Sequence, residues 1–473
     1  MSFIRIQKFG KQDYAYEITS YWDKKTKSPK QKSLYLGVVI DKEKKIFERR
    51  IQHKENERLI LDYGDTFLIK NFFGQTGFEQ LLQRVFGNGL QNVLALLSYR
   101  LCHGSAMMYA KTWFDGSYAK LQYPDANLSS QRVSEFLKLL SDEGLQRKFF
   151  QEYIPTIPKN KSGIIIDGTS LPNQIHIPLT AWGLSGEEID KQIRFLLIVD
   201  EKSKQPLYFR TLAGNILDVS TLNNSIQELK QYGIEKAFTF VDAGFFSEDN
   251  ILELYKNEMN FLIRLPSQRI LYKELVANHA KNMETASNIV RNGKRGLFVK
   301  QVEVNLFGKN AFAYLVLDPK RKGREIDRLI IQNADEAEKQ ETELEYALST
   351  RGLMILVSSF SILKTEVVQT YYLRQAAEML FGFSKDDIAL LPLRVHSEDN
   401  LRGFLFLQFI TLVAFTLLKQ KLGKEYTVEE ALITMRNLKC KVFSKEVIVG
   451  ELTKEQKQIT EKLGVLVTKS SGI

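Results

Sequence analysis

Short runs of apolar residues recur through the middle of this 473-residue chain, separated by stretches whose apolar residues are spaced three and four apart. The first pattern is typical of strands buried on both faces, and the second is typical of amphipathic helices. Strands that alternate with helices predict an α/β fold built on one sheet. The predicted strands are 163–167, 192–200, 206–212, 237–242, 260–265 and 353–359, with helices at 218–232 and after Ser247.

The N-terminal region has a different pattern. Residues 1–65 are dense in strand-forming side chains, which predicts a strand at 14–21 and a hairpin that joins 34–40 to 45–48. Five lysines lie on a predicted loop between these strands, where they would either contact phosphates or simply face solvent. They are Lys24, Lys25, Lys27, Lys30 and Lys32.

Residues 66–160 are predicted to be helical. Apolar residues at 133, 136, 137 and 140 follow the i, i+3, i+4, i+7 spacing of a helix, with Ser129 or Ser130 as its cap. A short break at 141–144 precedes a second helix that ends near Tyr153. This helix–turn–helix pattern has two interpretations: either Gln131 and Arg132 enter a DNA groove, or the two helices only pack together.

Residues 266–352 interrupt the alternation of strands and helices. Two apolar stretches, 297–307 and 311–317, flank Gly308 and predict a hairpin, and Leu329 is expected to begin a further strand. We therefore interpret 266–352 as a mainly β insertion into the α/β domain. Candidates for DNA contact in its predicted turns are Lys320, Arg321 and Lys322.

The end of the chain is predicted to be helical. Capping-box patterns at Thr427 and Thr453 each open a helix. The most apolar run, 404–418, is interrupted by Gln408 and is interpreted as a core helix, so no membrane partner is expected. The predicted domains are 1–65 (β-rich), 66–160 (helical, DNA-binding), 161–265 with 353–420 (catalytic), 266–352 (insertion) and 421–473 (helical tail).

Composition adds two constraints. The formal net charge is +10 and the pI is near 9.2, which favours a polyanionic partner such as DNA. The two cysteines form no CxxC pair, which excludes a zinc module of that kind and fits a reducing cytosol. The first residues lack the long apolar core of a signal peptide, so a cytoplasmic location is expected.

The candidate chemistry lies on one predicted helix over 371–385. At about 100° per residue, Tyr371, Arg374, Glu378 and Lys385 fall on one narrow stripe. An amphipathic helix with a charged solvent face is the alternative interpretation. Two acids favour the first interpretation, because Asp167 and Asp242 each end a predicted strand. Ligands of α/β sheets collect at such strand ends.

These residues resemble a known family. The spacing Tyr371-x2-Arg374-x3-Glu378-x6-Lys385 is similar to the Tyr-Arg-Glu-Lys signature of DDE transposases of bacterial insertion sequences, in their IS-four type group. Three further segments are similar to that group. Ile166-Asp167-Gly168-Thr169 resembles its first-aspartate segment, and Val241-Asp242-Ala243-Gly244-Phe245 resembles its second-aspartate segment. The stretch 214–221 is similar to the segment between these two aspartates. The resemblance covers about 160–420 and implies a ribonuclease H-like catalytic fold with an insertion before the glutamate.

The resemblance also implies roles for these residues. Asp167, Asp242 and Glu378 would hold two divalent cations, naturally Mg²⁺ with Mn²⁺ able to substitute, for in-line displacement at a phosphodiester. Tyr371, Arg374 and Lys385 would hold the neighbouring DNA phosphates. A homodimer in the synaptic complex is implied as well.

The expected function is that of a bacterial, nucleoid-associated transposase. It would bind the inverted-repeat ends of its own element in double-stranded DNA, cleave there, and join the freed 3′-hydroxyls to target DNA. The alternative is a catalytically inactive or co-opted transposase that acts as a DNA-binding protein. A nucleotide-binding oxidoreductase is set aside, because the turn after the first strand has only one glycine, Gly168.

Overall fold

The computed structural model divides into two compact units. The first unit comprises residues 1–59, 441–448 and 470–473, and the second comprises 60–440 and 449–469. The residues that the structure describes are 2–10, 12–23, 26–42, 44–48, 59–158, 163–185, 188–215, 219–234, 238–241, 243–334, 341–382, 393, 395–443, 446–468 and 470–472.

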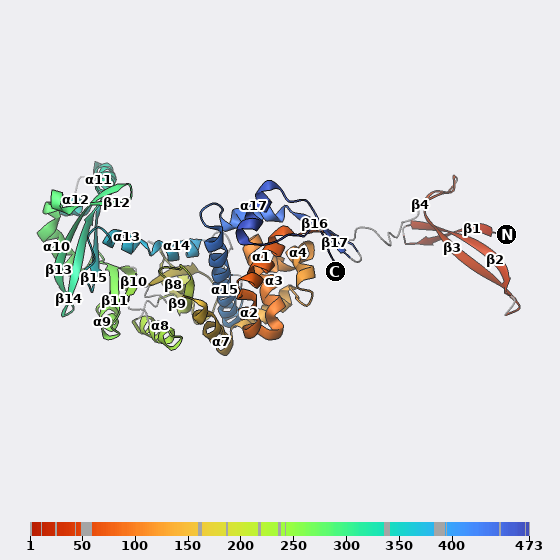
Figure 1. The fold of residues 1–473 in the computed structure, drawn as a ribbon, viewed down its shortest axis with the longest axis horizontal. Coiled ribbons are helices and arrows are strands. Elements are labelled where there is room, and N and C mark those ends of the chain that lie inside the picture. Colours follow the sequence, from red (N-terminus) through yellow and green to blue (C-terminus); the bar gives the residue numbers. More distant parts are fainter. Residues whose placement is uncertain are drawn as a thin grey trace. The chain divides into compact units, whose positions relative to one another are not determined.

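The first unit contains a four-stranded antiparallel sheet in the order β1-β2-β3-β4 (Figure 1). Its strands are β1 (Ser2–Phe9), β2 (Gln12–Asp23), β3 (Ser28–Asp41) and β4 (Ile46–Glu48). The strand predicted at 14–21 and the hairpin to 45–48 are therefore confirmed. The loop prediction is wrong for Lys30 and Lys32, which lie within β3 because this strand begins earlier than its apolar residues suggested.

The second unit is built on a ten-stranded mixed sheet with the path β12-β13-β14-β15-β11-β10-β6-β8-β7, in which β9 also pairs with β8. Strands β6, β10 and β11 are parallel, and their other neighbours are antiparallel. The predicted α/β fold with a buried sheet is confirmed, since β15 is buried at every position. The strands in chain order are β6 (Ile164–Pro172), β7 (Ala181–Ser185), β8 (Glu188–Asp200), β9 (Pro206–Ala213), β10 (Phe238–Val241), β11 (Asn260–Arg264), β12 (Ile289–Asn292), β13 (Arg295–Leu306), β14 (Lys309–Leu317) and β15 (Leu353–Ser358).

The region predicted as a mainly β insertion also contains helices. The hairpin of β13 and β14 is confirmed, and β14 pairs with β15, so these strands extend the central sheet. The strand predicted at Leu329 is wrong, because this residue lies in α11 (Pro319–Ala334). Asp318 caps that helix by accepting a hydrogen bond from the backbone of Arg321 at 3.0 Å, and proline follows at the first helical position, where its fixed φ suits a helix. The other helices here are α10 (Ile270–His279) and α12 (Glu341–Thr350).

The predicted helical region before the sheet is confirmed. Helix α6 (Ser130–Leu140) follows Ser129, and Asp142 caps α7 (Glu143–Tyr153) by accepting from the backbone of Leu145 at 2.7 Å. The remaining helices here are α1 (Gly64–Gln75), α2 (Phe78–Phe86), α3 (Leu90–His103), α4 (Ala110–Gly116) and α5 (Ala119–Gln122). Helices α8 (Val219–Gln231) and α9 (Glu248–Lys256) follow β9 and β10, as predicted.

Helix α15 (Glu398–Leu422) is the core helix predicted from 404–418. It packs so closely on α6 that a Cβ added at Gly403 would lie 1.8 Å from the carbonyl oxygen of Leu137. Among the described residues α15 is long and apolar enough to cross a membrane by length and composition, but 89% of its apolar window is buried inside the protein. This burial fits a core helix.

Both predicted capping boxes in the tail are confirmed. Thr427 caps α16 (Val428–Arg436) and Thr453 caps α17 (Lys454–Leu463), each with the reciprocal side-chain bond. The tail also contains short strands that the sequence did not predict, because each has only three or four residues. They are β16 (Lys439–Val442), β17 (Glu446–Val449) and β18 (Ser470–Gly472); β5 (Leu59–Asp62) is a further short strand, before α1.

Candidate active site

Asp167 lies in the middle of the central sheet. It is 5% exposed, and its parallel neighbour β10 pairs with β6 up to Val241, opposite Ile166. The antiparallel pairing with β8 continues to Pro172, so Asp167 is not the last residue of its strand as predicted. It lies instead where the parallel ladder stops, and its Oδ1 accepts a hydrogen bond from the backbone of Gly168 at 3.0 Å.

The single helix predicted over 371–385 is not continuous. Helix α13 (Val367–Tyr372) and helix α14 (Gln375–Gly382) are separated by a turn at Leu373 and Arg374. The backbone of Arg374 donates to the carbonyl of Tyr371 at 3.3 Å, three residues back, so the turn is tighter than an α-helix. The predicted stripe therefore does not run along one regular helix.

Arg374 nevertheless contacts three other predicted site residues. Its Nη1 lies 3.4 Å from Oδ2 of Asp167, and its Nη2 lies 2.7 Å from Oε1 of Glu378. Its guanidinium carbon is 5.7 Å from the ring centroid of Tyr371, which is buried. One guanidinium thus connects an acid of β6 with an acid of α14, about two hundred residues away in the chain.

The two carboxylates differ in exposure. The side chain of Glu378 is 48% exposed, whereas those of Asp167 and Arg374 are 7% and 18% exposed. A guanidinium between two carboxylates reduces their mutual repulsion, and here each carboxylate contacts a different nitrogen of Arg374. Carboxylate oxygens are the donors that a hard divalent cation prefers, and such a cation would have to displace the guanidinium from them.

Two of the predicted site residues, Asp242 and Lys385, lie outside the described residues. Strand β10 ends at Val241, the residue before Asp242 in the sequence. Among the residues that the structure describes, no group of three or more His, Cys, Asp or Glu side chains could hold a metal. The described part of the site thus supplies two acids, Asp167 and Glu378, which Arg374 connects.

The basic residues predicted to contact DNA differ in whether they already have an acidic partner in the protein. Arg321 and Lys322 lie on α11 rather than in a turn, and they form ion pairs with Glu325 and Glu284 at 2.6 and 2.5 Å. Lys320 is exposed on the same helix. Arg321 and Lys322 therefore have carboxylate partners that a DNA phosphate would need to replace.

The same distinction holds at α6 and in the N-terminal sheet. Gln131 and Arg132 are exposed, but both bond to Glu135, at 3.0 and 2.6 Å. Lys30 forms an ion pair with Asp23 at 2.5 Å, while Lys27 and Lys32 are exposed. Lys24 and Lys25 lie outside the described residues.

A cavity beside the signature contains residues that the sequence did not single out as site residues. It measures about 450 Å³ and is lined by Asn292, Lys294, Arg295, Tyr372 and Gln375. The turn between β12 and β13 thus contributes two cations next to α13 and α14. The only sequence signal was the adjacent basic pair, because nothing local indicates that this turn faces the signature.

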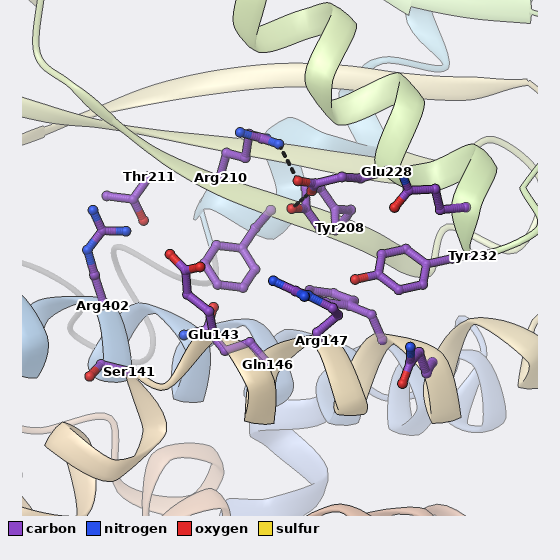
Figure 2. A pocket seen from close by; sticks show the side chains of 14 residues that line it. Ser141, Glu143, Gln146, Arg147, Tyr208, Arg210, Thr211, Glu228, Tyr232 and Arg402 are labelled. Atoms are coloured by element: carbon purple, nitrogen blue, oxygen red, sulfur yellow. Dashed lines mark hydrogen bonds and ion pairs between the residues drawn. The ribbon is translucent and has the colours of Figure 1, made fainter.

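A second cavity lies between α7, β9 and α8, and shares no residue with this site (Figure 2). It measures about 660 Å³, and Arg210 of β9 forms an ion pair with Glu228 of α8 at 2.7 Å across it. Tyr208 also donates a hydrogen bond to Glu228, and burial raises the pKa of this tyrosine. The Arg210 and Glu228 charges compensate each other, and the rest of the lining adds Arg147 and Arg402 against Glu143, so the lining carries a net charge of only +1.

Comparison with known proteins gives three results. The family model described as "Transposase DDE domain" matches residues 158–414. A cryo-EM structure of a piggyBac transposase synaptic complex with hairpin DNA is similar over 79% of this chain and 70% of that chain, at 12% sequence identity and a TM-score of 0.38. No curated protein sequence matches this chain significantly. Since the family model matches more than half of the chain and includes Asp167, Arg374 and Glu378, the protein belongs to the DDE transposase family.

Proposed function

We propose that this DDE transposase binds the inverted-repeat ends of its own insertion sequence, cleaves the DNA there and transfers the 3′-hydroxyl ends to target DNA. The observation that carries the proposal is the contact of Arg374 with both Asp167 and Glu378. These acids come from separate elements and meet at a partly open position, where a phosphodiester has access.

The strand arrangement supports a ribonuclease H-like catalytic core. Strands β6, β8 and β9 form an antiparallel set, and β10 and β11 continue from β6 in parallel. In this fold the first acid lies on the central strand, which is the place of Asp167 on β6. The proposed core therefore has its first acid, Asp167, at the centre of the sheet and Glu378 on the adjoining helix α14.

Two divalent cations are the proposed cofactors, naturally Mg²⁺, with Mn²⁺ as a substitute. Asp167 and Glu378 offer carboxylate oxygens on the two nitrogens of one guanidinium, and Asp242 is proposed as the third donor. Bound cations of this kind polarise the phosphodiester and activate the attacking hydroxyl. Asp167 is nearly buried, so its carboxylate is held in place before any ion binds.

The remaining signature residues are proposed to hold DNA phosphates. Arg374 offers a planar fork for a phosphate, and its stacking on Tyr371 fixes the plane of that fork. Lys385 would add a second positive charge. Double-stranded DNA is thus the proposed partner, within a homodimeric synaptic complex in the cytoplasm and nucleoid of a bacterium.

The test is cleavage of a labelled duplex that carries the element's ends, with and without Mg²⁺. Wild-type protein should nick the end junction only with the metal, and Glu378→Gln should abolish nicking. Glu455→Gln, an exposed acid on α17, is the matched control and should cleave normally. End binding without cleavage by wild-type protein would indicate a co-opted DNA-binding protein, and equal cleavage by Glu378→Gln would refute the assigned site.

A further inference from the structure

The N-terminal sheet presents an aromatic surface. Along β1 and β2 the register places Phe3 opposite Ile18, Arg5 opposite Tyr16 and Phe9 opposite Gln12, and residues that face each other across a ladder share one side of a sheet. Tyr16 in turn pairs with Tyr35 of β3, and Trp22 with Pro29. The aromatic residues on this side, called the aromatic face below, are Phe3, Phe9, Tyr14, Tyr16, Trp22 and Tyr35.

Four rings of this face, those of Phe9, Tyr14, Tyr35 and Tyr16, form a continuous row. The centroids of Tyr16 and Tyr35 are 5.4 Å apart, those of Tyr14 and Tyr35 are 6.3 Å apart, and those of Phe9 and Tyr14 are 5.9 Å apart. Such spacings allow the rings to support one another in place. The three tyrosines are partly accessible in the row, so each ring retains a surface for a ligand.

The other two rings of the face, and Phe9 at one end of the row, are largely exposed. Phe3, Phe9 and Trp22 are 48%, 59% and 63% exposed, which is unusual for three large aromatic side chains within one small sheet. The described part of residues 2–48 consists of strands and turns only, without a helix. The aromatic face is therefore a surface to which a partner has access.

The charge of this region indicates the kind of partner. Residues 1–59 contain 15 Lys and Arg against 8 Asp and Glu, so this eighth of the chain carries seven of its ten net positive charges. On the aromatic face itself, the guanidinium carbon of Arg5 lies 5.7 Å from the ring centroid of Phe3. Aromatic rings and cations together are what unpaired bases and their phosphates require.

We propose that the aromatic face binds single-stranded nucleic acid, with unpaired bases stacked on Tyr16 and Tyr35 and with the backbone held by Arg5, which lies opposite Tyr16 on the same face. This inference extends the DNA partner proposed above and does not depend on the DDE chemistry. Duplex DNA is less suited to the rings, because its bases are stacked on each other and present only their edges. A second copy of this chain is less suited as well, because two such basic units repel each other.

The experiment measures binding of the full-length protein to a fluorescently labelled oligothymidylate of about 16 nucleotides, a typical site size for single strands. Wild-type protein should bind it at low salt. Tyr16→Ala combined with Tyr35→Ala should weaken binding roughly tenfold or more, because each stacked base is lost. Tyr16→Phe combined with Tyr35→Phe keeps the rings and should bind like the wild type.

Tyr21 supplies the matched control. It is 50% exposed and lies on the opposite face of the same sheet, where it pairs with Lys30. Tyr21→Ala should bind the oligonucleotide as the wild type does. If it weakens binding as much as the double alanine variant does, the aromatic face is not the binding surface.

Other outcomes overturn the inference without ambiguity. Absence of oligonucleotide binding by wild-type protein refutes it, as does equal binding by the double alanine variant. Loss of self-association in the double alanine variant, with no oligonucleotide binding by the wild type, would assign the face to a second copy instead. Asp167→Asn should keep oligonucleotide binding while it loses cleavage, so failure of the proposed function and failure of this inference are distinguishable.

Discussion

The two sheets of this protein contrast in burial and in charge. Strand β15 of the central sheet is buried at all six positions, whereas strand β1 of the N-terminal sheet is exposed at all eight. The central sheet belongs to a unit with a large apolar core, and the N-terminal sheet lies in the region with most of the net charge. A buried sheet fixes Asp167 in one position, while an open sheet offers its side chains to a partner.

The contrast explains why the central sheet suits catalysis. Asp167 is nearly inaccessible, and its neighbours Ile165 and Ile166 are fully buried, so the carboxylate cannot move without disturbing the core. The Lys27 and Lys32 side chains of the N-terminal sheet are exposed and can adapt to a flexible partner. Substitutions in the two regions should therefore have different kinds of effect, and four predictions test this.

The largest effect is expected at Arg374. Replacing it with alanine removes the guanidinium between Asp167 and Glu378 and should lower the rate of DNA cleavage by about 10²- to 10³-fold. Single-turnover nicking of the end duplex measures this rate. Arg84→Ala removes an exposed arginine, paired with Glu152, and should leave the rate unchanged. If the Arg374→Ala variant cleaves at the normal rate, Arg374 is not part of the active site.

The next largest effect concerns close packing. Gly403→Ala would place a methyl group against the Leu137 carbonyl at 1.8 Å, and should destabilise the protein by about 3 kcal/mol through overpacking of α15 against α6. Gly10→Ala in the N-terminal sheet meets no atom within 4 Å, but it has φ +62° and should cost about 1 kcal/mol.

Urea unfolding measures both changes. Gly296→Ala is the control, because this glycine has neither a neighbouring atom within 4 Å nor a positive φ, and its midpoint should stay near that of the wild type. Equal losses at Gly403 and Gly10 would contradict the difference in packing between the helical core of the second unit and the N-terminal sheet.

A smaller effect is expected in the salt dependence of DNA binding. Log affinity should fall steeply with log salt, and Lys27→Ala with Lys32→Ala should reduce the slope by up to about 2, one counterion per phosphate contact. Arg321→Ala with Lys322→Ala should change it less, because these cations already have carboxylate partners. A slope that responds more to the second pair would move the DNA contact to the insertion. If the affinity of the wild type for DNA does not change with salt, phosphate contacts do not contribute to DNA binding.

The smallest effect concerns the two thiols of the second unit. Burial raises the pKa of Cys440 to about 11 and also raises the pKa of Cys102, so both thiols are protonated at neutral pH. The reaction of Cys440 with a thiol reagent at pH 7 should be roughly 100-fold slower than that of a free cysteine and should accelerate as the pH approaches 11, and Cys102 should also react more slowly than a free cysteine. A cysteine introduced by Ser20→Cys on the exposed N-terminal sheet is the reference and should react at once. Fast labelling of the native thiols would show that this core opens readily.

The sequence by itself determined the elements whose signals are local. The buried strands β6 and β15 follow from their apolar runs. The hairpin of β13 and β14 follows from the turn at Gly308, and the two capping boxes follow from four-residue patterns. Spacing within one segment also identified Tyr371, Arg374 and Glu378 as a group. Such signals act over a few residues, so they can be read without the fold.

Tertiary structure decided what depends on distant residues. Leu329 forms part of α11 rather than a strand, and Glu325 of this helix accepts a hydrogen bond from the backbone of Gly352, 27 residues further along the chain. The strands of the insertion join the central sheet, and the break between α13 and α14 places Arg374 between acids of two elements. The row of Tyr16 and Tyr35 likewise depends on the register of β2 with β3. Register and long-range ion pairs are set by how the whole chain packs, and no local pattern encodes them.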